Sequence, residues 1–429
     1  MNPHFVPHAD TDHDVFLHVL LAMAIVLLLA RLVGRLFTRI GQPAVIGEMF
    51  AGIMLGPSLL GRIAPHASAF VLPPAITPQL GVLAQIGVVL YMFLVGLELD
   101  PGRLRSRARS AVVISASGIA VPLLLGSLCA GFLYDRVAPA GVPQFLFGAF
   151  FCVALSVTAF PVLARIVVER GIEKTAMGTL ALTCAAADDI AAWCLLSIVV
   201  SFAKAKPSDG LVTLALAGCY VVLMIVFVRP LLRRLAEREQ QDRPLSRSTL
   251  SSVFGALLLS ALMTEWIGIH ALFGAFLLGA LMPSHGRLAE RLTAKLEDVV
   301  SVLLLPMFFA FTGLRTQIGL LTDLSSWLLC ALVIALAFLG KLGGVFIAAR
   351  LAGTPLRSAL SLAALMNTRG LMELIVLNVG LDLGIISPLL FTIMVVMALV
   401  TTCAAGPLLT WFGQDAEAQA SDPLLTAAR

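Results

Sequence analysis

The chain has 429 residues, of which 59% are hydrophobic and 13% are charged, and its mean hydropathy is +0.99. Soluble domains carry about 25% charged residues, so this composition excludes an ordinary soluble fold and indicates a polytopic membrane protein. The formal net charge of +4 is small. Because the basic residues gather between apolar runs, they relate to membrane orientation and do not indicate nucleic-acid binding.

All seven cysteines lie inside apolar runs, and none has a CxxC or Cys/His spacing. The spacing therefore predicts neither a disulfide framework nor a zinc site, and no cofactor is expected. Residues 1–14 contain three His and three Asp but no Lys or Arg, and no small-residue cleavage site follows the first apolar run. We expect this run to be retained as a first membrane span, with residues 1–14 as an extracytoplasmic segment.

Apolar runs along the whole chain predict an all-α fold. A span needs a minimum of about 17 apolar residues, and shorter or broken spans are allowed where helix breakers interrupt a run. On this basis the sequence predicts thirteen transmembrane helices. They are expected at 15–37, 42–59, 80–98, 109–133, 144–169, 174–203, 210–234, 248–266, 267–284, 295–314, 323–351, 356–380 and 385–412.

The positions of the 29 Lys and Arg residues predict how the chain is oriented in the membrane. With the N-terminus outside, 22 of them fall on the cytoplasmic side, five fall outside and two, Lys341 and Arg369, fall within spans. This asymmetry follows the positive-inside rule. We therefore expect an integral membrane protein with its N-terminus outside and its C-terminal tail, residues 413–429, in the cytoplasm.

Three short segments of the first half recur in the second half, so that helices one to six are repeated as helices eight to thirteen. Seven helices separate equivalent positions, and because seven is odd the two copies must be inverted relative to each other. Inverted repeats with a linking helix are typical of secondary transporters. The paired segments are 44–52 with 271–279, 93–97 with 310–314, and 154–158 with 364–368.

Two equivalent spans contain helix breakers at mid-depth, which predicts two discontinuous helices that cross. Unwound backbone at membrane depth is tolerated only where protein or a water-filled cavity covers it. Unwound carbonyls and helix C-terminal ends attract cations, so the crossover beside a carboxylate pair predicts a cation site. The breakers and their polar neighbours are Thr158 and Pro161 in the fifth span and Asn367, Thr368, Arg369 and Gly370 in the twelfth.

Two adjacent carboxylates, Asp188 and Asp189, lie near the middle of the sixth span. Each costs about 2.5 kcal/mol or more at that depth, so an ion or proton site is the first interpretation. The alternative is a purely structural ion pair with Lys341, which lies in the middle of the eleventh span. Consecutive helical residues point about 100° apart, so the two aspartates are expected to have different roles.

Glu373 follows Arg369 at i+4. At this spacing the two charges can neutralise each other along their helix or hold the crossover together.

These motifs resemble the monovalent cation:proton antiporter family, which includes bacterial sodium/proton antiporters, potassium efflux systems and plant cation/proton exchangers. The resemblance covers nearly the whole chain and is nearest to the plant-exchanger-like members. Its marks are Pro43–Pro57, Ser156–Arg165, Asp188–Asp189, Gly340–Lys341 and Asn367–Ile375.

The resemblance implies that Asp189 binds cation and proton in turn, that Asp188 pairs with Lys341, and that Thr158 lines the site for Na⁺ or K⁺. It also implies a homodimer in membrane lipid. The domains that it implies are scaffold helices at 15–98 and 248–314, core helices at 109–203 and 323–412, and a linking helix at 210–234.

Two departures from the family pattern limit this transfer. Many bacterial members carry a glutamate directly after the Arg-Gly of the crossover, whereas here Gly370 is followed by Leu371, so the family role does not pass to Glu373. The nucleotide-binding regulatory domain of the potassium efflux systems has no counterpart in residues 413–429.

The function predicted from the sequence is proton-coupled exchange of Na⁺ or K⁺ by alternating access, and not an enzymatic activity. A cation channel or potassium efflux pathway without obligatory proton coupling is the alternative. An intramembrane aspartyl protease would need a Gly-x-Gly-Asp signature, which does not occur in this sequence.

Overall fold

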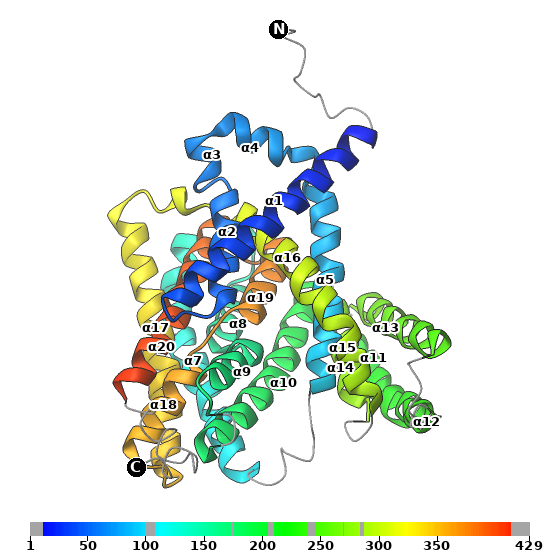
Figure 1. Cartoon of the computed structure of the whole chain (residues 1–429). Helices are drawn as coiled ribbons and strands as arrows, with labels where there is room; N and C mark the ends of the chain where they lie inside the picture. Colours follow the sequence, from blue (N-terminus) through cyan, green and yellow to red (C-terminus); the bar gives the residue numbers. More distant parts are fainter. Residues whose placement is uncertain are drawn as a thin grey trace, which may run out of the picture.

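The computed structural model describes residues 12–98, 108–172, 175–204, 210–238, 246–268, 270–283 and 287–412. These residues form α-helices joined by short turns (Figure 1). Most of the predicted extracytoplasmic segment and all of the predicted tail, residues 413–429, lie outside the described residues.

The first third of the chain forms two long helices, a shorter apolar helix between them, and small helices at one end. We name this end, at the top of Figure 1, the α4 end, and the opposite end the α12 end. The sequence did not predict α3 and α4. The bounds are α1 (Asp12–Arg39), α2 (Ala44–Leu55), α3 (Leu60–Ile63), α4 (Pro65–Val71), a 3₁₀ turn (Pro74–Ile76) and α5 (Thr77–Glu98).

The middle of the chain contains the first broken helix. Helix α8 ends at Ser156 and α9 begins at Phe160, so three residues interrupt what would otherwise be one span. A π-helical segment joins α11 to α12, and the three form one continuous run. The bounds are α7 (Ala108–Val137), α8 (Gln144–Ser156), α9 (Phe160–Glu169), α10 (Ala176–Lys204), α11 (Gly210–Leu223), the π segment (Met224–Val228) and α12 (Arg229–Arg238).

The last part of the chain contains the second broken helix, between α18 and α19. The run from α15 to α16 begins at Arg287, earlier than the predicted residue 295. These first turns escape a prediction based on apolar runs, because they are amphipathic and charged. The bounds are α13 (Arg247–Ile267), α14 (Ala271–Leu281), α15 (Arg287–Asp298), a π segment (Val299–Leu304), α16 (Leu305–Arg315), a 3₁₀ turn (Ile318–Leu320), α17 (Leu324–Leu351), α18 (Leu356–Met366), α19 (Leu371–Asp382) and α20 (Pro388–Trp411).

Eleven helical segments in the described part of the chain are long and apolar enough to cross a membrane. Two further apolar helices, α8 and α14, are shorter. The chain is therefore an integral membrane protein built of helices.

The helices pack in two groups. In the first, α1 packs on α2, α13 on α14, α2 on α16, and α5 on both α14 and α16. In the second, α7 packs on α17, α8 and α10, while α17 also contacts α18 and α20. Both broken helices belong to the second group. We name the first group the scaffold and the second the core.

Close backbone crossings fix the geometry of the scaffold. A Cβ added to Gly52 of α2 would lie 2.1 Å from the carbonyl oxygen of Phe309 in α16, and one added to Gly313 of α16 would lie 2.0 Å from the backbone of Gly52. Likewise, a Cβ on Gly96 of α5 would lie 2.4 Å from the Phe276 carbonyl oxygen of α14. Only glycine permits these approaches, as in other tightly packed membrane helices.

Replacing Gly52 with alanine is expected to separate α2 from α16 and to lower the free energy of unfolding by about 1–3 kcal/mol or more. Gly255 of α13 is the matched control, because a Cβ there would meet no atom within 4 Å. Alanine at 255 should be neutral or slightly stabilising, since alanine favours helices over glycine. Thermal unfolding in detergent measures both variants, and equal transition temperatures for them would contradict the close crossing.

Candidate functional site

Asp188 of α10 accepts hydrogen bonds from three side chains of the core. Its Oδ2 atom accepts hydrogen bonds from Lys341 Nζ of α17 at 2.7 Å and from Thr158 Oγ1, in the break between α8 and α9, at 2.9 Å. Its Oδ1 atom accepts a hydrogen bond from Ser115 Oγ of α7. The side chains of Asp188 and Lys341 are 1% and 0% exposed, so this ion pair is sealed from water. One carboxylate therefore joins four segments of the core.

Lys341 has a second acceptor besides Asp188. Its Nζ atom donates to the carbonyl oxygen of Ser156, the last residue of α8, at 2.7 Å. A lysine ammonium carries three donors, and the free carbonyls at a helix C-terminus favour a positive charge. The lysine that the sequence placed in a span is thus bound by a carboxylate and a helix end.

Asp189 differs from its neighbour in every contact. It is equally buried, at 1% exposure, but neither of its carboxylate oxygens has a hydrogen-bond partner among the described residues. The backbone amide of Phe160, the first residue of α9, also interacts with this carboxylate. A buried carboxylate without partners is costly, and such groups in native proteins call for a functional explanation.

The two breaks in the helices lie against each other. The Ala159 amide donates to the Thr368 carbonyl oxygen at 3.0 Å, and Thr158 Oγ1 lies 3.0 Å from the carbonyl oxygen of Met366, the last residue of α18. Pro161 occupies the first turn of α9, where its missing N–H has no helical partner to lose; its side chain lies outside the described part. The predicted crossover residues therefore do come together.

Arg369 is buried where the two breaks meet. Its Nη1 atom donates to Glu373 Oε2 at 2.9 Å and to the Ala154 carbonyl oxygen at 3.1 Å, and its Nη2 atom donates to the Leu155 carbonyl oxygen. The pair with Glu373 has the i,i+4 spacing that the sequence indicated. The Thr402 hydroxyl of α20 accepts a hydrogen bond from the Arg369 amide and donates one to the Arg369 carbonyl oxygen.

These contacts revise one expectation about the helix ends. The sequence predicted that the C-terminal carbonyls of the broken helices would attract a transported cation. At α8 the last three carbonyls, those of Ala154, Leu155 and Ser156, instead accept hydrogen bonds from the arginine and the lysine. The positive charges of Arg369 and Lys341 therefore already occupy the C-terminal end of α8. The sequence cannot reveal this, because both residues lie far from α8 along the chain.

The remaining predicted crossover residues have simpler surroundings. Thr368 Oγ1 donates to the Leu365 carbonyl oxygen at 2.8 Å. A Cβ on Gly370 would lie 2.8 Å from a methyl group of Val162, which explains the need for a glycine where α9 approaches. Both amide atoms of Asn367 are buried without a partner among the described residues.

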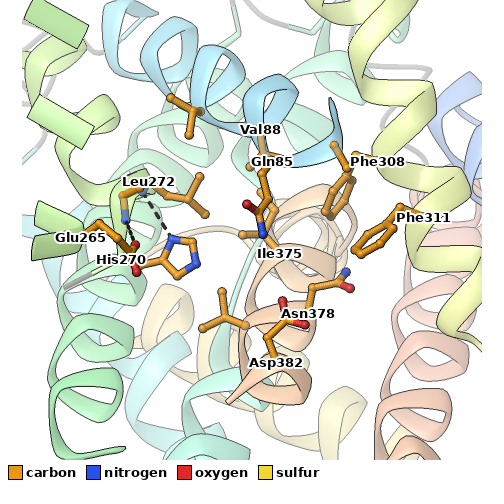
Figure 2. Close-up of a pocket in the computed structure, with 14 residues that line it drawn as sticks. Gln85, Val88, Glu265, His270, Leu272, Phe308, Phe311, Ile375, Asn378 and Asp382 are labelled. Carbon is orange, nitrogen blue, oxygen red and sulfur yellow. Dashed lines mark hydrogen bonds between the residues drawn. The ribbon is translucent and has the colours of Figure 1, made fainter. Parts of the chain in front are cut away.

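Two cavities lie between the scaffold and the core. The larger, of 630 Å³, lies toward the α12 end, and its lining extends from Glu297 of α15 and Arg165 of α9 to Val162 and Leu371 beside the crossover. The smaller, of 230 Å³, lies toward the α4 end between α5, α14, α16 and α19. Figure 2 shows Gln85, His270 and Asn378 converging on it from three sides.

A polar contact joins scaffold and core at the α4 end. Arg315 of α16 forms an ion pair with Asp382 of α19 at 2.6 Å and donates to Asn378 Oδ1 at 3.2 Å. Asn378 Nδ2 in turn donates to Thr312 Oγ1 of α16 at 2.9 Å. The two groups of helices are thus tied together at this end and separated by the larger cavity at the other.

Among the residues that bond to the aspartate pair, the sequence missed Ser115. Serine is common in membrane helices, and nothing in its spacing marks it. Its partner Asp188 lies 73 positions further along the chain, so only the packing of α7 against α10 reveals the contact.

The sequence matches the family model for the transmembrane part of sodium/hydrogen exchangers over residues 24–414. The Na⁺/H⁺ antiporter NhaS4 of Synechocystis is 45% identical over 399 residues, which are 92% of this chain and 97% of that protein. Cation/H⁺ antiporter 17 of Arabidopsis thaliana is 41% identical and K⁺/H⁺ antiporter 1 of Saccharomyces cerevisiae is 32% identical. The alignments cover 91% and 90% of this chain but 48% and 45% of those two proteins, so it spans about half their length.

The fold is similar to that of the sodium proton antiporter MjNhaP1 from Methanocaldococcus jannaschii. The TM-score is 0.68 at 16% sequence identity, and the alignment covers 93% of this chain and 99% of that one. At this identity the likeness concerns the fold alone. The family model and the relatives confirm the resemblance in the motifs, and the chain therefore belongs to the sodium/hydrogen exchanger family, whose members are secondary transporters.

Proposed function

We propose that this protein exchanges a monovalent cation, Na⁺ or K⁺, for protons across the membrane, and that Asp189 binds each of them in turn. The observation that carries the proposal is the charge balance of the core. Two ion pairs cancel there, which leaves one carboxylate without a partner among the described residues. The buried Asp, Glu, Lys and Arg side chains of that part of the chain are Asp188 with Lys341, Glu373 with Arg369, and Asp189.

A single unpaired carboxylate accounts for obligatory exchange. Either one proton or one monovalent cation makes the site neutral, and a neutral site can cross the hydrophobic barrier at much lower cost than a charged one. Because both ligands need the same carboxylate of Asp189, they exclude each other. On one side of the membrane, Asp189 must release its proton before it can bind a cation. On the other side, it must release the cation before it can bind a proton.

Thr158 is the proposed second oxygen ligand of the transported cation. Its hydroxyl has one proton, which points to Asp188 or to the Met366 carbonyl oxygen, both within 3.0 Å. The oxygen keeps lone pairs for a cation. Asp188 and Lys341 form the charge-neutral wall of the site, and the pair of Arg369 with Glu373 holds the crossover in place.

The proposed architecture has thirteen spans in two inverted six-helix repeats. The helix contacts support it, because they occur in equivalent pairs: α1 with α2 and α13 with α14, α2 with α16 and α14 with α5, and α7 with α8 and α17 with α18. The glycines paired in the sequence repeat also pack in equivalent ways, Gly52 against Gly313 and Gly279 against Gly96.

The proposed transport cycle is alternating access, with the core moving against the scaffold. With the N-terminus outside, the α12 end faces the cytoplasm. The 630 Å³ cavity at this end reaches Val162 and Leu371, while Arg315 and Asp382 bridge the other end. This arrangement corresponds to an inward-facing state, and opening to the outside would require the Arg315–Asp382 pair to separate. We further propose a homodimer formed through the scaffold helices in the lipid of the bacterial inner membrane.

Cation-driven proton movement in sealed vesicles tests the function. Purified protein is incorporated into vesicles that contain a pH-sensitive dye, the membrane potential is clamped, and an inward gradient of NaCl or KCl is imposed. Exchange predicts alkalinisation of the interior, since protons leave as the cation enters. Vesicles without protein are the control. Uptake of radioactive cation without any pH change would contradict the proposal and would favour a channel.

A further inference from the structure

Ser115 of α7 is bonded to the transport site but belongs to no recognised motif. We infer that Ser115 is a positioning residue for cation binding: its hydroxyl fixes the Asp188 carboxylate, which in turn orients Thr158 toward the cation. This inference rests on the proposed function, because it assigns Ser115 a part in the same site.

The first step is the contact between Ser115 and Asp188. Ser115 is 4% exposed, and its Oγ atom donates to Asp188 Oδ1. The donors to the other oxygen, Oδ2, are Lys341 and Thr158. Among the described residues, Ser115 is therefore the donor that distinguishes one carboxylate oxygen from the other. Without it, the Asp188 carboxylate is held through one oxygen only, so its plane can turn relative to Lys341 and Thr158.

The second step leads from Asp188 to Thr158. The Thr158 hydroxyl has two acceptors within 3.0 Å, Asp188 Oδ2 and the Met366 carbonyl oxygen. Which of them receives the proton decides where the lone pairs of the Thr158 oxygen point. A fixed Asp188 oxygen favours one orientation, because hydrogen bonds to a charged acceptor are about twice as strong as bonds between neutral groups.

The third step is the rigidity of the frame. Helices α7 and α17 cross so closely that a Cβ on Gly344 would lie 2.8 Å from the Ser117 carbonyl oxygen, and one on Gly340 would lie 3.1 Å from Pro122. Ser115 and Lys341 are thus held on two facing helices that cannot easily slide. Groups that orient a metal ligand typically change ion affinity by about 10–100-fold when they are removed.

The test uses initial rates of cation-driven proton movement in vesicles as a function of NaCl or KCl concentration. Ser115→Ala should raise the apparent KM for the cation about tenfold, with the maximal rate per folded protein largely unchanged. Ser115→Thr keeps the hydroxyl and should restore the wild-type KM. Ser117→Ala is the matched control. It removes a hydrogen bond of 2.9 Å to the Gly344 carbonyl oxygen between the same two helices but does not touch Asp188, so its KM should stay at the wild-type value.

A wild-type KM in Ser115→Ala, or an equal rise in Ser117→Ala, would overturn the inference. If Ser115→Ala does not fold, Ser115→Cys keeps the shape with a weaker donor. It should show a smaller rise in KM, and an unchanged KM would again overturn the inference. Failure of the proposed function is distinguishable, because wild-type vesicles would then show no cation-driven proton movement at any concentration.

Discussion

Replacing Asp189 with asparagine is expected to reduce cation-driven proton movement to the level of vesicles without protein. Asparagine has nearly the same shape, but it neither binds a proton near neutral pH nor attracts a cation with a full negative charge. Because the Asp189 oxygens have no hydrogen-bond partner among the described residues, the change breaks no ion pair within that part of the chain. The variant should therefore be at least as stable as the wild type in thermal unfolding.

This combination of inactivity and undiminished stability separates a transport role from a structural one. A carboxylate that held the fold together would lower stability when it is neutralised. Thr183→Val is the control on the same helix: among the described residues the Thr183 hydroxyl donates to the Thr179 carbonyl oxygen at 2.8 Å within α10 and does not contact the aspartate pair, so exchange should persist in this variant. Exchange at the wild-type rate by the Asp189→Asn protein would remove Asp189 from the mechanism.

Breaking the Asp188–Lys341 pair from one side is expected to lower the free energy of unfolding by about 3–5 kcal/mol, because the remaining charge stays buried without its partner. Asp188→Asn leaves the Lys341 ammonium, which is 0% exposed, with only neutral acceptors among its described partners, the new amide oxygen and the Ser156 carbonyl oxygen. It also leaves a positive charge next to the cation site, so exchange should be lost together with stability. Thermal or denaturant unfolding in detergent measures the first effect, and the vesicle assay measures the second.

The double variant Asp188→Asn with Lys341→Met should recover most of that stability, because no unpaired charge remains. A double-mutant cycle then gives the coupling energy of the pair. We also expect measurable exchange by the double variant, since Asp189 and Thr158 are still present and the repelling charge is gone. A folded double variant without exchange would instead assign Lys341 a direct part in the transport cycle.

The charge balance of the core explains why the two predictions differ in sign for stability. Asp188 has three hydrogen-bond donors and Asp189 has none among the described residues, although the two are adjacent in the sequence and equally buried. We therefore expect the first to stabilise the fold and the second to cost stability, which the proposed transport role would explain. Such a conflict between local stability and function is what an ion-binding site requires, because a carboxylate that the protein satisfies by itself has little affinity left for a ligand.

The amino-acid sequence by itself determined the class of this protein, its family and the position of the aspartate pair. Long apolar runs can be satisfied only as membrane helices, and charged residues inside them are too costly to occur without a reason. The breakers at Pro161 and Gly370 mark the interruptions, because backbone geometry acts locally along the chain.

The pattern of the residues left open which aspartate is paired, and the family resemblance implied Asp188. Only the tertiary structure gives the contacts that pair Asp188 with Lys341 and leave Asp189 without a hydrogen-bond partner among the described residues. The deciding contacts join residues that lie far apart: Ser115 is 73 positions from Asp188, Lys341 is 153 positions from it, and Arg369 is 214 positions from Leu155. Helical periodicity shows that neighbouring aspartates point about 100° apart, but it cannot say which of the two directions meets a donor. That depends on how α7, α17 and the crossing helices pack around α10, and therefore on the fold as a whole.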